Sequence, residues 1–85
     1  MRGGHLRGAV PRGASRRQLE VLAAFVEVGG VAGAASLMGI RPSTVKHHLA
    51  DLRARSGLTT EQLIYAGRAS GWLVIPSLEP GHNGI

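Results

Sequence analysis

The sequence is short of several residue types, and each shortage excludes a class of protein. It has no cysteine, which excludes a disulfide framework and thiolate chemistry and suits a reducing compartment. Its acidic residues are one Asp and four Glu, and no glycine-rich phosphate loop follows a strand, so we expect no enzyme activity and no cofactor. No apolar run approaches the roughly 20 residues that span a bilayer, and none follows the basic N-terminus. We therefore expect a cytoplasmic protein without a secretory signal.

Aromatic residues and metal ligands are also scarce. Phe25, Tyr65 and Trp72 are the three aromatic residues, too few for a platform that stacks single-stranded nucleic acid. His47 and His48 are neighbours, and adjacent side chains on a helix point about 100° apart, so we expect no metal site there. His48 is instead expected to be partly buried against the first or second helix.

The net positive charge of the chain comes from one end. Eighty-five residues allow one small domain, near the lower limit for folding alone, which favours an all-α design or a dimer. The formal net charge of +5 lies wholly in residues 1–17, because residues 18–85 contain five basic and five acidic side chains. The five basic residues of this end are Arg2, Arg7, Arg12, Arg16 and Arg17. Arginine favours bidentate phosphate contact, so this end is interpreted as a nucleic-acid-binding arm. The alternatives are a solvated, glycine-rich leader or a cloning artefact, because residues 10–13 resemble part of an engineered protease site.

Cap and turn residues divide the chain into four helices between two tails. Ser15 and Gln18 form a capping box, and Thr59 and Gln62 have the same spacing. The predicted helices run from about 16 to 28, 31 to 38, 42 to 56, and 60 to near 71, each followed by glycine. We predict a flexible basic arm over 1–14, an all-α, four-helix helix-turn-helix bundle over 15–75 and a disordered tail over 76–85.

The third predicted helix has two distinct faces. Val45, Leu49 and Leu52 recur at helical spacing and predict one buried stripe. The remaining face carries Ser43, Lys46, His47, Ala50 and Arg53. A short helix precedes it, as in a helix-turn-helix whose second helix enters the DNA major groove. Lysine can donate to guanine O6 and N7, hydroxyls at a helix start reach phosphates, and Ala50 can offer a methyl contact.

Two family resemblances follow from these residues. Thr44-Val45-Lys46-His47-His48-Leu49, followed by Leu52 and Ser56-Gly57-Leu58, resembles the LuxR/GerE-type DNA-binding domain over about residues 15–74. The stretch 29–37, with Ala34-Ala35, is closer to the second helix of LysR-type regulators. The chain departs from the LuxR/GerE pattern at Arg41, where that family has Ser or Thr to cap the helix.

The LuxR/GerE resemblance implies a role for each matched residue. Lys46 and His47 would face the major groove, with Ala50 one turn further along. Phosphate contacts would come from the start of the helix and from its flanks, and these residues are Arg41, Ser43, Thr44, Arg53 and Arg55. The fourth helix would pair with its copy in a homodimer, and the residues assigned to that contact are Tyr65, Trp72 and Leu73.

The function expected from the sequence is sequence-preferring binding of double-stranded DNA by a bacterial or phage transcriptional regulator. One alternative is a helix-turn-helix module that binds RNA polymerase or another regulator, which the sparse polar face of helix 31–38 favours. Another is an accessory protein of phage DNA packaging or recombination. The chain could also be a fragment of a larger regulator. We expect no membrane partner and no small-molecule ligand.

Overall fold

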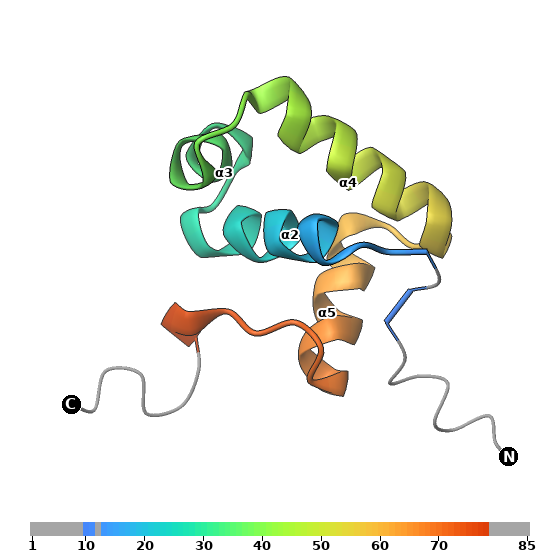
Figure 1. The fold of residues 1–85 in the computed structure, drawn as a ribbon. Helices are drawn as coiled ribbons and strands as arrows, with labels where there is room; N and C mark the ends of the chain where they lie inside the picture. The colour runs from blue at the N-terminus through green and yellow to red at the C-terminus, as the bar shows by residue number, and fades with distance from the viewer. Residues whose placement is uncertain (1–9, 12, 79–85) are drawn as a thin grey trace, which may run out of the picture.

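The computed structural model of the chain describes residues 10–11 and 13–78 (Figure 1). This part folds into four α-helices and one short 3-10 helix, without a strand. The elements are α2 (Arg16–Val28), α3 (Val31–Met38), α4 (Pro42–Ser56), α5 (Thr60–Ser70) and η1 (Pro76–Leu78). The predicted all-α fold is confirmed, with its four helices in the predicted ranges. Arg2, Arg7, Arg12 and the tail residues 79–85 lie outside the described residues.

Two capping boxes start α2 and α5. The Ser15 hydroxyl accepts a hydrogen bond from the Gln18 N–H at 3.0 Å, and Gln18 Oε1 accepts one from the Ser15 N–H at 3.0 Å. Thr59 and Gln62 exchange the same pair of bonds at 3.1 and 3.0 Å. Each box satisfies two backbone donors that an α-helix leaves without an internal acceptor. Local sequence alone therefore fixes where these helices begin.

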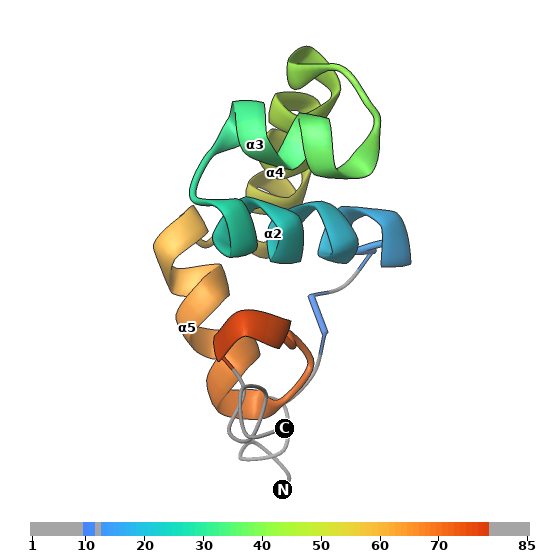
Figure 2. The same cartoon turned by 90° about the vertical axis from the view of Figure 1, so that its left-hand side faces the viewer.

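The turn between α3 and α4 depends on Gly39. This residue has φ +69°, in the left-handed region that glycine enters without steric cost. The N–H of Ile40 then bonds to the Ala35 carbonyl at 3.0 Å, which closes the end of α3. The chain resumes at once in α4, so α3 and α4 form the predicted helix-turn-helix (Figure 2).

The core lies where α2, α3 and α4 meet. The α4 stripe predicted from the sequence is buried: Val45 and Leu52 are 0% exposed and Leu49 is 5% exposed. It packs with Val21 and Leu22 of α2. The contribution of α3 is two buried alanines, whose small side chains let the helices approach closely. This packing holds α4 across α2 and α3 with its other face outward.

The segment after α5 folds back beneath α2 and completes the core (Figure 1). Leu73 is 3% exposed and Ile75 is 0% exposed, and the Leu73 N–H bonds to the Gly67 carbonyl at 3.0 Å. The approach is close because Gly67 lacks a side chain: a Cβ there would lie 2.6 Å from the Leu73 Cβ. The assignment of Leu73 to a dimer contact is therefore corrected, since this side chain is buried within its own chain.

The C-terminal boundary also differs from the prediction. The tail was expected to begin at residue 76, yet Pro76–Leu78 forms η1, and the Leu78 N–H bonds to the Ile75 carbonyl at 2.9 Å. Buried Ile75 anchors this turn, so order extends three residues further than the sequence pattern indicated.

Within the described residues no single helix is long and apolar enough to cross a membrane, although α2 and α3, bent by 118°, meet that test together by length and composition.

Candidate nucleic-acid interface

The outward face of α4 presents the side chains that the sequence singled out. Ser43, Lys46, His47, Ala50 and Arg53 are all exposed. They lie on the side of the helix away from the buried stripe, because residues along an α-helix are rotated by about 100° each. The predicted reading face is thus one continuous surface of one helix. His48 is partly buried, as expected, and its ring centre lies 6.3 Å from that of His47.

The start of α4 is open to an anion. Arg41 occupies the N-cap with φ −79° and ψ 148°, and its side chain makes no capping hydrogen bond. Pro42 is the first helical residue, where a missing N–H costs nothing. Arg41 and Ser43 are exposed beside this end, whereas Thr44 is partly buried. A helix N-terminus carries a partial positive charge, so the arrangement suits a phosphate.

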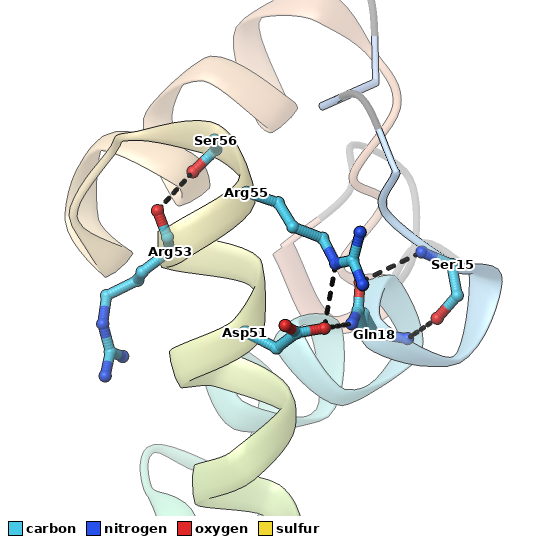
Figure 3. A network of polar contacts seen from close by, with 6 residues as sticks. All are labelled: Ser15, Gln18, Asp51, Arg53, Arg55 and Ser56. Carbon is cyan, nitrogen blue, oxygen red and sulfur yellow. Dashed lines mark hydrogen bonds and ion pairs between the residues drawn. The ribbon is translucent and has the colours of Figure 1, made fainter.

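Arg53 and Arg55 point to opposite sides of α4 (Figure 3). Arg53 Nη1 donates to the Thr60 hydroxyl at 3.1 Å, which places this guanidinium beside the start of α5. Arg55 Nε donates to Asp51 Oδ2 at 2.9 Å, on the side of α2. The sequence predicts that both arginines lie near the DNA backbone, but their side chains lie on different flanks of α4. Arg53 shares the flank of Lys46, whereas Arg55 lies on the other flank and pairs with a carboxylate.

Gln18 connects α2 to the middle of α4. It is the buried polar side chain of the described residues, with 6% of its surface exposed. Its Nε2 donates to Asp51 Oδ2, across 33 positions of sequence, while its Oε1 stays in the capping box with Ser15 (Figure 3). Both polar ends of the buried amide are thus satisfied, as a buried polar group requires. Asp51 in turn accepts from Arg55 and so receives two donors.

These donors stabilise the ionised form of Asp51. The hydrogen bond from Arg55 is the largest cause that lowers the pKa of Asp51 below its ordinary value of 3.8. Burial is the next-largest cause and raises the pKa, whereas the charge of Arg55, the Gln18 amide and the nearby His47 each lower it by a smaller amount. Asp51 is therefore a carboxylate at neutral pH, turned toward α2.

The remaining predicted contact residues are less closely grouped. Arg16 and Arg17 are exposed in the first turn of α2, and Arg17 pairs with Glu20 at 3.4 Å. On α5, Tyr65 is 78% exposed and borders a shallow hollow with Glu61, Ile64, Arg68 and Ala69. Trp72 is partly buried, and its indole N–H has no hydrogen-bond partner in the described part of the chain. Of the three residues assigned to a dimer contact, Tyr65 is the one that presents a large free surface.

Sequence reasoning missed one contact and one separation of side chains in this region. Gln18 was identified as a capping residue, but its bond to Asp51 joins residues too far apart for any local pattern to reveal. The separation of Arg53 from Arg55 was available from the sequence, because residues two apart on a helix point about 200° from each other.

Within residues 10–11 and 13–78, no group of three His, Asp or Glu side chains is placed to hold a metal ion.

Comparison with known proteins identifies a family. The family model described as bacterial regulatory helix-turn-helix protein, lysR family, matches residues 16–63, which span α2, α3, α4 and the first residues of α5. No curated protein and no solved structure matches the chain. The match agrees with the resemblance noted for residues 29–37. The LuxR/GerE resemblance is not confirmed by it.

Proposed function

The chain belongs to the lysR family of bacterial regulatory helix-turn-helix proteins, and from this premise we propose that it is a transcriptional regulator that prefers particular DNA sequences. In this proposal α4 enters the major groove. Lys46 and His47 contact base edges, and Ala50 offers a methyl contact. Arg41, Ser43 and Thr44 meet phosphates at the start of the helix, and Arg53 meets the backbone on one flank.

One observation carries the proposal. Lys46, His47 and Ala50 are exposed together on the face of α4 opposite a fully buried stripe, at the second helix of a helix-turn-helix. A helix held this way presents its polar side chains without moving its backbone. Because so few groups read bases, one copy of the domain should have little sequence preference, and paired half-sites should increase it.

The test combines selection of bound duplexes from a random pool with two matched variants. Lys46→Ala removes a positive charge from the proposed reading face, and Arg68→Ala removes one from α5. We expect Lys46→Ala to weaken binding to the selected duplex by about 1–3 kcal/mol. On a duplex with a single half-site, to which pairing through α5 does not contribute, Arg68→Ala should bind nearly as the parent does. Equal losses in both variants would show that binding depends on charge alone and would refute the assignment of Lys46.

We also propose that two copies pair through α5. Tyr65 is largely exposed, with Glu61 one turn before it and Arg68 about one turn after it. In an antiparallel pair of such helices, Glu61 of each copy would lie near Arg68 of the other, which is the self-complementary pattern of a twofold interface. The second copy would supply a second reading helix. Sedimentation of the protein alone and on a duplex with two half-sites tests the stoichiometry.

A second candidate function is favoured by the composition of α3. Residues 28–40 contain no charged side chain, and α3 exposes Ala32, Ser36 and Leu37, of which Leu37 is 58% exposed. Such a surface offers few groups to a DNA backbone and suits a protein surface, for example that of RNA polymerase. Leu37→Ser should then weaken binding to purified RNA polymerase and leave DNA affinity unchanged, whereas Lys46→Ala should do the reverse. Accessory roles in phage DNA packaging or recombination would use the same α4 face.

A further inference from the structure

The bridge between Gln18 and Asp51 has a role that packing alone does not explain. The core to which α2 and α4 both contribute is apolar and includes Val21, Val45 and Leu49. Aliphatic packing is non-directional, so it tolerates small rotations of a helix about its own axis. A hydrogen bond restricts both distance and angle. The amide of Gln18 therefore supplies a directional constraint that the apolar core lacks.

The constraint acts at the point on α4 where rotation matters. Asp51 lies one turn after His47 and one residue after Ala50. Because α4 is a rigid helix, the direction in which Asp51 points about the helix axis also sets the direction in which His47 and Ala50 point. At the other end, Gln18 cannot shift freely, because it is buried and its Oε1 is held by the Ser15 N–H at 3.0 Å. Figure 3 shows Ser15, Gln18 and Asp51 in one line from the start of α2 to the middle of α4.

We propose that Gln18 and Asp51 are positioning residues that set the rotation of α4, and so determine which bases this helix reads. The inference depends on the proposed function, since it concerns how DNA is discriminated. It assigns to a buried amide in α2 an influence on sequence preference, although Gln18 itself faces the protein interior. Breaking the bridge should therefore reduce discrimination between sequences more than it reduces affinity for DNA in general.

A swapped pair gives the sharpest test. Gln18→Glu keeps an acceptor for the Ser15 N–H but places a carboxylate against Asp51, so the bridge breaks. Adding Asp51→Asn restores a hydrogen bond with donor and acceptor exchanged, and the double variant has the net charge of the parent. Asp51→Asn alone keeps an acceptor for Gln18 Nε2 while it weakens the pair with Arg55, so it separates the bridge from the ion pair.

The readout is the ratio of the dissociation constants for a random duplex and for the selected duplex. A uniform change in protein charge alters both constants and cancels in this ratio. We expect Gln18→Glu to lower the ratio about tenfold, the equivalent of one misread base pair. The double variant and Asp51→Asn should remain close to the parent. Val21→Ala, which removes buried methyl groups without touching the bridge, serves as the control for lost stability and should leave the ratio unchanged.

Two outcomes would overturn the inference: an unchanged ratio in folded Gln18→Glu, or a lowered ratio that the double variant fails to restore. If circular dichroism shows that Gln18→Glu does not fold, Asp51→Ala decides, because it removes the acceptor from a partly exposed position. An unchanged ratio in that variant contradicts the inference, and a lowered one supports it. If the parent itself selects no sequence from the pool, the proposed function fails, and this result is distinct from any change among variants.

Discussion

Arg41 occupies a position where the same chain elsewhere uses a hydroxyl. Its φ and ψ of −79° and 148° resemble those of Ser15, at −90° and 159°, and of Thr59, at −75° and 167°. Both of these residues cap their helices by accepting the N–H three residues on, and Arg41 does not. The substitution Arg41→Ser therefore needs no change of backbone conformation at residue 41, and the new hydroxyl can share the N–H of Thr44, which bonds to the Arg41 carbonyl at 3.0 Å.

Two variants separate the two contributions to the expected gain in stability, which are the removal of the cation and the addition of the cap. Arg41→Ala removes a cation from the positive end of α4, worth about 0.3–1 kcal/mol when exposed and less in salt. Arg41→Ser does the same and adds a cap, worth about 0.5–2 kcal/mol relative to alanine. For a domain of this size each kcal/mol raises the melting temperature by about 4–8 °C. Thermal unfolding followed by circular dichroism should thus rank serine above alanine and alanine at or above the parent.

The same variants should lose affinity for DNA as they gain stability. If Arg41 contacts one phosphate, removing it lowers the slope of log affinity against log salt by about 0.9 in both variants. Fluorescence anisotropy with a labelled duplex over a range of salt concentrations measures this slope. Serine no more stable than alanine would contradict the capping argument. An unchanged slope would show that Arg41 does not meet a phosphate.

Four further outcomes can be measured on the same protein. Gly67→Ala should destabilise the fold by about 1–3 kcal/mol in a thermal melt, because the added Cβ would lie 2.6 Å from the Leu73 Cβ. The lowered pKa of Asp51 means that its contribution to stability is present above its ordinary value of 3.8 and is lost as the pH falls below that value, so Asp51→Asn should flatten acid unfolding in this range. Deleting residues 2–9 removes two arginines, and the salt slope should fall by up to about 1.8 if each meets a phosphate. Tyr65→Glu should reduce binding to a duplex with two half-sites more than binding to one half-site, and equal losses would exclude pairing through α5.

The parts of the fold that the sequence predicted are those set by neighbouring residues. Ser15 with Gln18 begins a helix, Gly39 permits the left-handed turn, and the spacing of Val45 and Leu49 defines a buried face. Each of these signals acts within one or two helical turns, so reading along the chain is enough to detect it. The face of α4 that carries the candidate site was predicted for the same reason.

The parts that the sequence did not predict depend on contacts between distant segments. Leu73 was assigned to a surface because an apolar run at the end of a helix can fold back or pair with a copy, and only the close approach to Gly67 decides between these. The contact of Gln18 with Asp51 likewise requires the crossing of α2 and α4 to be known. Residue type gives each side chain its chemistry, but the packing of the helices decides which partner it meets.

Two residues of the core, Leu73 and Ile75, lie after α5 and are therefore synthesised late. Ribosomes add about 5–20 residues each second, so α2, α3 and α4 are complete before the last two core residues exist. A chain that ends at Ser70, whether by early termination or by a protease cut after α5, keeps every side chain on the outward face of α4 but lacks part of its core. Loss of the segment after α5 would therefore destabilise the fold and shorten the lifetime of the protein, while the outward face of α4 stays intact.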